Sequence, residues 1–281
     1  MSHAPLSPED AARFRAFERA RHDKLAPTYA GFFAHVTAQA IAPLLAAVQA
    51  GPGMRLLDVA AGPGALAAAA AALGAQAEGV DLSPGMVALA RASHPGLVFQ
   101  EAAVEALPFA DASFGAVAIN FGIGHFPRPA EALAECLRVL APGGRLAMSW
   151  WDVPAKQRVQ GVFRDASAEV GLPPPAAVPK GHSNLRFCDS AELAGVLAEA
   201  GFSQPVVTEH AGEHVLPDVE TLWQGGLGSL AVTAAAIAEQ PAEKQAAIRA
   251  ALERHAAPYL TPRGLVLPVA FKVAAGRKPL A

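Results

Sequence analysis

Residues 56–67, LLDVAAGPGALA, place one carboxylate, two glycines and a proline within an otherwise apolar run. An apolar run that meets a Gly-Pro-Gly turn and then an alanine-rich segment is typical of a buried strand leading into a helix. Gly62 and Gly64 carry no Cβ and can adopt positive φ, so the loop can turn tightly while a ligand lies against its main chain. We interpret it as the binding loop for a nucleotide-like ligand, against the alternative of a plain strand-to-helix turn.

Short β-type runs alternate with helical ones from residue 54 onward. Strands joined by single helices pair in parallel, because a parallel connection must cross over the sheet. The apolar runs do not alternate with polar residues, which indicates that both faces of the sheet are covered. The sequence therefore predicts an α/β fold with a doubly wound sheet. Its first strands are expected at 54–60, 75–81, 97–102, 115–121 and 145–151, its helices at 65–73, 83–93 and 129–140, and a turn at 141–144.

Composition restricts the class of protein and partner. The 281 residues are 52% hydrophobic and carry a formal charge of −3 without a Lys/Arg-rich run, so we expect a small-molecule partner and no nucleic acid. The stretch 59–77 is interpreted as a strand end and a buried helix instead of a membrane span, because alanine drives insertion weakly. Cys136 and Cys188 are too few for a disulfide framework, which favours the cytoplasm. The sequence leaves a homodimer open.

The glycine loop alone does not choose the ligand. Gly62, Gly64 and Ala67 also satisfy the dinucleotide pattern G-x-G-x-x-G/A. Asp58 stands where a dinucleotide-binding strand normally carries an apolar residue, and its carboxylate can meet a cationic group. Asp81 ends the next strand, and its oxygens are placed to accept hydrogen bonds from two ribose hydroxyls. Asp81 therefore supports an adenosine ligand in either cofactor class.

Four motifs together resemble the class I S-adenosylmethionine-dependent methyltransferases, especially the small-molecule enzymes similar to ubiquinone and menaquinone methyltransferases. They are LLDVAAGPG at 56–64, GVDLSPGMVALAR at 79–91, VEALPFADASFGAVAINFGIGHF at 104–126 and CLRVLAPGGRLAMSWWD at 136–152. The resemblance implies a mostly parallel seven-stranded Rossmann-like sheet. It also implies S-adenosylmethionine as cofactor, S-adenosylhomocysteine as product, and methyl transfer to a small, partly apolar molecule.

The resemblance assigns parts of the cofactor to particular residues. The methionine end would be lined by Asp58, Ala60, Gly62 and Gly64. Asp58 would act near the ammonium group and Asp81 would hold the ribose. The adenine would meet Leu82, Met86 and the main chain around Ala103 and Val104. The pocket beneath the sulfonium would be closed by Asn120 and Phe121, and Tyr29 would reach over the cofactor from the N-terminal part.

One position departs from the family pattern. The family usually has Gly-Asp-Ala before E-x-L-P-F, whereas this chain has Ala102, Ala103 and Val104 before Glu105. Ala103 therefore replaces the aspartate whose carboxylate would accept from the adenine amino group. A main-chain carbonyl, a water molecule or Gln100 are the expected substitutes, and an unpaired amino group would weaken binding by roughly 1–3 kcal/mol.

The chemistry of methyl transfer depends mostly on positioning and exclusion of water, because the leaving group departs neutral. His125 follows the strand that ends near Asn120 and is the candidate general base, against the alternative of a hydrogen-bonding or surface histidine. Trp150 and Trp151 are candidates for a flat apolar substrate pocket, with core packing as the alternative.

Other interpretations of the sequence are weaker. HAGEH at 210–214 matches a metalloprotease pattern that needs a helix, but its context predicts a strand, so no metal is expected. NFGI at 120–123 lacks the prolines and aromatic residue of amino-group methylases of nucleic-acid bases. The functional alternatives are an NAD(P)-dependent oxidoreductase and a relative with this fold that binds the cofactor without transferring a methyl group.

Four regions are expected: an N-terminal helical lid, a cofactor-binding core, a lid or substrate insertion, and the rest of the core. Their bounds are 1–50, 51–152, 153–188 and 189–281. The first region should contain a helix over 8–24. The last should contain a helix begun by Asp189, two final strands, and between them an insertion of two helical segments over about 218–257.

Overall fold

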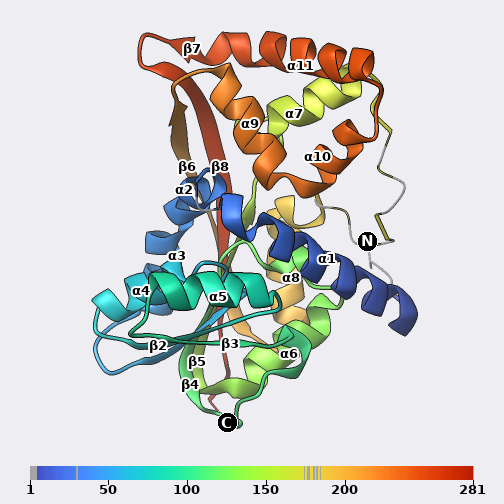
Figure 1. Cartoon of the computed structure of the whole chain (residues 1–281). Coiled ribbons are helices and arrows are strands. Elements are labelled where there is room, and N and C mark those ends of the chain that lie inside the picture. Colours follow the sequence, from blue (N-terminus) through green and yellow to red (C-terminus); the bar gives the residue numbers. More distant parts are fainter. Residues whose placement is uncertain are drawn as a thin grey trace.

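A central sheet of eight strands organises the chain (Figure 1). The computed structural model describes residues 5–280 except 30, 174, 176–177, 180, 182 and 184. The strands run in the order β3-β2-β1-β4-β5-β8-β6, and the short β7 pairs with β8. They are β1 (Arg55–Val59), β2 (Gln76–Asp81), β3 (Val98–Glu101), β4 (Phe114–Ile119), β5 (Leu140–Trp151), β6 (Ser203–Leu216), β7 (Leu260–Thr261) and β8 (Gly264–Arg277).

The pairing confirms the doubly wound α/β fold. Strands β1 to β5 are parallel, and β8 lies antiparallel between β5 and β6. Seven strands form the main path, as the family resemblance implies, and the two-residue β7 is an addition to them. The strand order reverses between β1 and β4, and ligands bind at the carboxyl ends of strands beside such a reversal.

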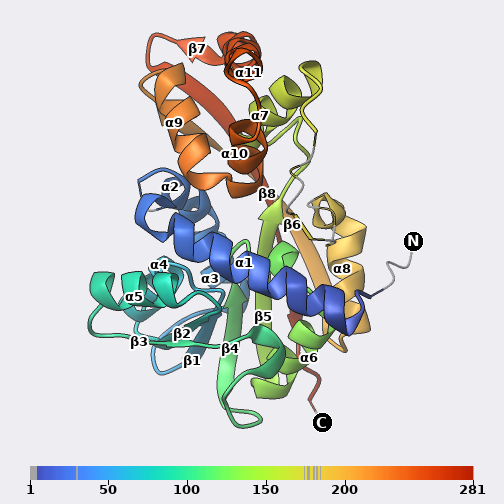
Figure 2. The same ribbon diagram turned by 45° about the vertical axis from the view of Figure 1, so that its right-hand side comes forward.

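Helices cover both faces of the sheet (Figure 2). One side carries α3 (Ile41–Val48), α4 (Ala65–Ala72) and α5 (Pro84–Ser93), and the other carries α6 (Pro129–Val139) and α8 (Ser190–Glu199). Local sequence fixes their starts. The side chain of Ser83 accepts a hydrogen bond from Met86 N at the start of α5, and Asp189 accepts one from Ala191 N at the start of α8.

A helical cap stands on the long strands beyond the core. Strands β5, β6 and β8 are 12 to 14 residues long, whereas β1 to β4 have four to six. In Figure 1 the extra length carries the cap away from the core. The cap helices are α7 (Arg158–Glu169), α9 (Val219–Ser229), α10 (Ala231–Ala238) and α11 (Ala242–Ala256). Short 3-10 helices are η4 (Arg186–Cys188) and η5 (Ala257–Tyr259).

The N-terminal region crosses between the core and the cap (Figure 2). It comprises α1 (Pro8–Tyr29), α2 (Phe33–Thr37) and η1 (Ala38–Ala40). The expected helix over 8–24 is present and runs five residues further. In the described part of the chain, no single helix is long and apolar enough to cross a membrane. Only α1 taken together with 33–48, across a 95° bend, passes that test by length and composition.

Several local expectations need correction. The segment at about 218–257 holds three helices instead of two, because Leu230 ends α9 and Pro241 begins α11. The expected turn at 141–144 is an irregularity inside β5, where the pairing with β4 shifts register. Six of the residues between 174 and 184, all in the expected insertion, lie outside the described residues. The strand expected around 210–214 is confirmed as part of β6.

The two loop glycines are required for different reasons. A Cβ at Gly62, at φ +52°, would meet nothing within 4 Å, so this position is open. A Cβ at Gly64, at φ +85°, would lie 2.5 Å from the ring of Phe99, below any real contact distance. Gly64 therefore permits packing of the loop on β3, and Gly62 alone leaves main chain exposed for a ligand.

Gly64→Ala should lower the stability of the fold. A residue with a side chain at positive φ costs about 1–2 kcal/mol, and overpacking against Phe99 adds about 1–3 kcal/mol. We expect a fall in Tm of at least about 4 °C by calorimetry. Gly96→Ala is the matched control, because its Cβ would meet nothing within 4 Å and its φ is not positive. Equal Tm values for the two variants would contradict the packing argument.

Candidate cofactor-binding and active site

A cavity of about 660 Å³ lies at the carboxyl ends of β1, β2 and β4. Its walls come from the loops after these strands, from α1 and α2, and from the cap helices α7 and α10. Eleven of the thirteen site residues expected from sequence line it: Tyr29, Ala60, Gly62, Asp81, Leu82, Met86, Ala103, Val104, Asn120, Phe121 and His125. Asp58 and Gly64 are the two that do not.

Asp81 connects two loops at the cavity. Its Oδ2 accepts a hydrogen bond from Gly62 N at 2.8 Å, and its Oδ1 accepts one from Ser83 N at 2.9 Å. Burial raises the pKa of Asp81, and these main-chain bonds oppose the rise. Each carboxylate oxygen keeps a further lone pair, so the side chain can still accept from a diol in the cavity.

Asp58 lies beneath the glycine loop instead of on the cavity wall. Its side chain is fully buried, and Oδ2 accepts from Ala67 N at 3.0 Å in the first turn of α4. Burial raises the pKa of Asp58 to about 8, with a further rise from the charge of Asp81. Its expected role beside a ligand ammonium stays a prediction. Asp58 fixes the start of α4, and the wall itself is formed by Ala60 and Gly62.

A narrow apolar section of the wall lies beyond Asp81. It is built by Leu82 and Met86 around the start of α5 and by 102–104 after β3. Met86 is 2% exposed, and the whole section matches the residues expected to meet an adenine ring. Gln100, one of the expected substitutes for the missing aspartate, is absent from the described residues that line the cavity. Glu105 lines it, and the sequence analysis did not single that residue out.

Polar bonds fix the loop after β4. Asn120 Oδ1 accepts from Ser149 Oγ at 2.9 Å, and Asn120 Nδ2 donates to the carbonyl of Thr37 at 3.2 Å. Phe121 has a φ of +54°, its N–H donates to Ser149 Oγ, and its ring stacks on Trp151 at 3.7 Å between centroids. Backbone held in this region by surrounding contacts is common at functional sites. Tyr29 reaches the same wall and donates to Thr37 Oγ1 at 3.4 Å.

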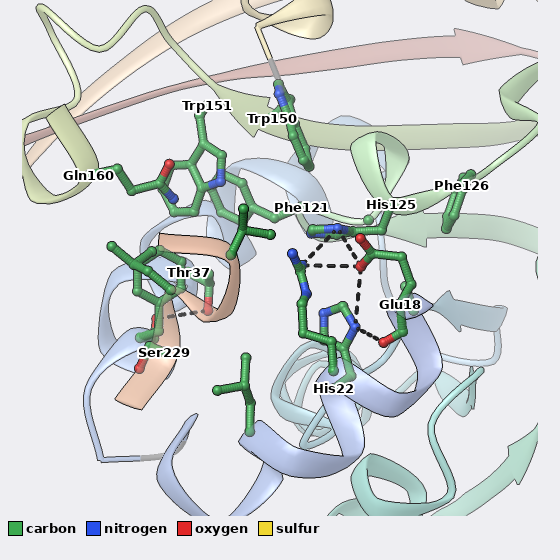
Figure 3. A pocket seen from close by; sticks show the side chains of 18 of the residues that line it. Glu18, His22, Thr37, Phe121, His125, Phe126, Trp150, Trp151, Gln160 and Ser229 are labelled. Carbon is green, nitrogen blue, oxygen red and sulfur yellow. Dashed lines mark hydrogen bonds and ion pairs between the residues drawn. The ribbon is translucent and has the colours of Figure 1, made fainter. Parts of the chain in front are cut away.

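His125 meets a charged cluster from α1 (Figure 3). Its Nδ1 lies 3.1 Å from Glu18 Oε2 and 3.3 Å from Arg21 Nη2, and Arg21 lies 3.1 Å from the same carboxylate oxygen. The His22 ring is perpendicular to the His125 ring at 5.1 Å between centroids. Glu18 and Arg21 were missed in the sequence analysis, because on a lone helix they resemble an ordinary surface pair.

The cluster sets the charge of its own members. Burial alone would raise the pKa of Glu18, but the positive charges of His125, Arg21 and His22 lower it to about 2. Burial and the neighbouring positive charges lower the pKa of His22 to about 3, so this ring is neutral near pH 7. Its Nδ1 donates to the carbonyl of Glu18 at 2.8 Å.

The same cluster has the composition of a metal site. Glu18, His22 and His125 place one ligand-type atom each within 4.8 Å of one another. Two imidazoles and a carboxylate suit Zn²⁺. However, the Arg21 guanidinium already contacts two of these three groups and supplies the positive charge that balances Glu18. That no metal takes part stays a prediction.

Aromatic side chains form the far part of the cavity, toward the cap. Trp151, Gln160, Thr37 and Ser229 lie opposite the charged cluster in Figure 3. The Trp150 ring packs edge-on to His125 at 5.5 Å between centroids. A Cβ at Gly124 would lie 2.2 Å from that indole, which explains why the loop before His125 carries a glycine. Both tryptophans are buried and also line the cavity, so each indole packs in the core and forms part of the cavity wall.

These features define a Rossmann-like protein with a nucleotide-type site next to a histidine. A family model described as a methyltransferase domain matches residues 57–148. The demethylmenaquinone methyltransferase of Renibacterium salmoninarum is 37% identical over 169 residues, covering 56% of this chain and 70% of that protein. The one of Chlorobaculum parvum is 39% identical over 140 residues, covering 46% and 58%. The YcgJ protein of Bacillus subtilis shares the fold, with a TM-score of 0.56 and 19% identity over 86% of this chain and 99% of that one.

The chain belongs to the class I S-adenosylmethionine-dependent methyltransferases. It is a methyltransferase of small molecules with S-adenosylmethionine as cofactor, and nothing in the comparisons favours the NAD(P)-dependent or non-methylating alternatives. The chain spans little more than half the length of the Chlorobaculum relative.

The residues present fit this cofactor. Gly62 leaves open space above the main chain, the Asp81 carboxylate suits a ribose diol, and the section formed by Leu82, Met86 and 102–104 suits a flat base. Asn120 and Phe121 lie on the opposite side of Asp81, toward His125. The positively charged sulfur is compatible with a wall that carries the carboxylates of Asp81 and Glu18.

Asp81→Asn should weaken binding of S-adenosylhomocysteine about 10- to 100-fold, because hydrogen bonds to a charged group are worth roughly 1.5–3 kcal/mol. Isothermal titration calorimetry measures the Kd. Glu78→Gln is the control, since Glu78 lies on the same strand, pairs with Arg55 at the surface and is outside the cavity lining. Unchanged affinity in Asp81→Asn would refute the ribose assignment.

Asp58→Asn should change how stability depends on pH. The pKa of Asp58 is about 8 in the folded chain and 3.8 ordinarily, so the folded state holds an extra proton between these values. The stability from that proton is complete below about pH 4 and is lost as the pH rises to about 8. Relative to the wild type, the free energy of unfolding of the variant should therefore rise by about 1–3 kcal/mol between pH 5 and 8. Parallel Tm curves across that range would contradict the burial of an ionisable Asp58.

Proposed function

We propose that this enzyme methylates a hydroxylated, partly apolar ring of the quinol type, with His125 as general base. The supporting observation is the position of His125. It lines the cavity just after Asn120 and Phe121 in the loop that follows β4, and its ring packs edge-on against the Trp150 indole at 5.5 Å between centroids. A ring seated against these indoles can present a hydroxyl to the imidazole.

The relatives and the lining support this choice of substrate class. The curated relatives named above are demethylmenaquinone methyltransferases. Phe33, Trp151 and Leu230 give the far part of the cavity an apolar surface, and Gln160 and Thr233 add a few polar groups. Cavities of this composition bind drug-sized apolar molecules and orient them through few hydrogen bonds.

The side chains divide the work of the reaction. Bound S-adenosylmethionine supplies an electrophilic methyl group on a positively charged sulfur. His125 Nε2 takes the proton of the substrate hydroxyl, which leaves an electron-rich ring. A ring carbon then bonds to the methyl group as the carbon–sulfur bond breaks and S-adenosylhomocysteine leaves. That carbon loses its own proton to solvent and His125 returns a proton to the oxygen, which restores the quinol. The Glu18 carboxylate lies 3.1 Å from His125 Nδ1, so its negative charge stabilises the imidazolium that forms. Arg21 neutralises Glu18 before the proton arrives.

The regions outside the core are proposed to close over the site. Residues 1–50 act as a lid, because α1 lines the cavity and contacts the cofactor-side loops through Asp23, which accepts from Gly85 N at 2.9 Å. The regions 153–188 and about 218–257 select the substrate, since α7 and α10 supply the far wall. A cytoplasmic location and a homodimer remain expectations; the two described cysteines are buried.

The test is a transfer assay with defined acceptors. The enzyme is incubated with S-adenosylmethionine and short-tailed demethylmenaquinol analogues, and release of S-adenosylhomocysteine is followed by mass spectrometry. Methylation of the free quinols is expected. Analogues with both hydroxyls blocked as ethers should be inert, because they have no proton for His125. If no quinol is methylated by enzyme that binds the cofactor, the substrate class is wrong.

His125→Asn should lower kcat about 10²- to 10⁴-fold, the usual contribution of a general base. Binding of S-adenosylhomocysteine should change little. Glu18→Gln should lower kcat with a small change in KM, and Glu18→Asp should restore part of it, because a carboxylate returns to His125. Arg19→Gln is the control from the same helix, since its surface pair with Glu101 does not touch the cavity. Full activity of His125→Asn on a quinol that the wild-type enzyme methylates would show that His125 is not the general base.

A further inference from the structure

Glu105 presents an unsatisfied buried acceptor at the cavity. It lies in η2 (Val104–Ala106), two residues after the alanine that replaces the expected aspartate. Its side chain is 7% exposed and lines the cavity. Oε1 is buried and accepts no hydrogen bond from any described residue, whereas Oε2 lies 3.5 Å from Arg15 Nη2 of α1. A buried carboxylate oxygen without a donor is costly, so this atom calls for a partner from outside the chain.

The register of the sheet places Glu105 at the base end of the site. Asp81, the last residue of β2, is opposite Glu101, the last residue of β3. The loop 102–105 therefore starts beside the ribose-binding carboxylate. The apolar section formed by Leu82, Met86 and 102–104 lies along this side of Asp81, and the methyl-transfer side with Asn120 and His125 lies along the other.

We propose that the Glu105 carboxylate accepts a hydrogen bond from the exocyclic amino group of the adenine ring, in place of the aspartate missing at Ala103. The amino group is the only hydrogen-bond donor on the base edge of the cofactor, and Oε1 is the buried acceptor at the matching end of the cavity. Arg15 Nη2 lies 3.5 Å from the other oxygen and balances its charge, so the carboxylate stays in place while it accepts. The inference rests on the cofactor assignment and is independent of the substrate.

Ligand substitution provides the sharpest test. S-inosylhomocysteine carries a carbonyl oxygen where S-adenosylhomocysteine carries the amino group, so the donor from which Glu105 would accept is replaced by an acceptor. Calorimetry should show that Glu105→Ala weakens binding of S-adenosylhomocysteine about 10- to 100-fold. The loss for S-inosylhomocysteine should be much smaller, so the preference between the two ligands should fall by the same factor. Glu105→Gln should also reduce the preference for S-adenosylhomocysteine, because the glutamine amide can donate to the carbonyl of S-inosylhomocysteine.

Glu101→Gln is the matched control. Glu101 forms the neighbouring pair with Arg19 of α1, its side chain is 43% exposed, and it does not line the cavity. The variant should keep the full preference for the adenine ligand. Equal losses of affinity for both ligands in Glu105→Ala would show that Glu105 only supports α1 and would overturn the proposal. An unchanged preference for S-adenosylhomocysteine over S-inosylhomocysteine in Glu105→Gln would also count against it. Failure of the wild type to bind S-adenosylhomocysteine would instead overturn the cofactor assignment.

Discussion

The carboxylate of Asp81 ties the two loops that make the cofactor wall. One oxygen accepts from Gly62 N and the other from Ser83 N, so the exposed main chain after β1 and the start of α5 are held by a single side chain. Without it, the N–H groups of Gly62 and Ser83 would lose their acceptor. Ser83 in turn accepts from Met86 N, and Asp23 of α1 accepts from Gly85 N. The order of the site therefore spreads from Asp81 to α5 and then to α1.

The docking of α1 depends on charge more than on apolar contact. Few of its residues are buried apolar side chains, and its contacts to the core include the pairs of Arg15 with Glu105 and Arg19 with Glu101. The Arg19–Glu101 pair is exposed, and such pairs are individually weak and are screened by salt. The buried contact of Glu18 with His125 is different, because it is shielded inside the cavity wall.

Local sequence patterns predicted the core well, because strand length, glycine position and the acid at a strand end depend on residues that are close together in the sequence. Asp81, Gly62 and the wall at Asn120 came from such patterns. The packing of Gly64 against Phe99 could not be predicted, since Phe99 lies 35 positions away in the chain. Likewise, only the fold shows that the Asp58 side chain faces α4. The ligand roles of both residues stay predictions. Only tertiary contacts bring the side chains of Glu18, Arg21 and Glu105 to the cavity, so the sequence pattern could not identify them.

One face of α1 connects the two ends of the active site. Arg15, Glu18 and His22 follow the i, i+3, i+7 spacing that lines up side chains along a helix, and all three line the cavity. Arg15 reaches the carboxylate at the base end, whereas Glu18 reaches the histidine at the methyl-transfer end. One docking event therefore completes both ends together. Because binding and closure are linked, a ligand that favours the docked helix through Glu105 also favours the Glu18 contact to His125. With Glu105 as the proposed contact to adenine and His125 as the proposed base, cofactor binding and placement of the base are therefore coupled through α1.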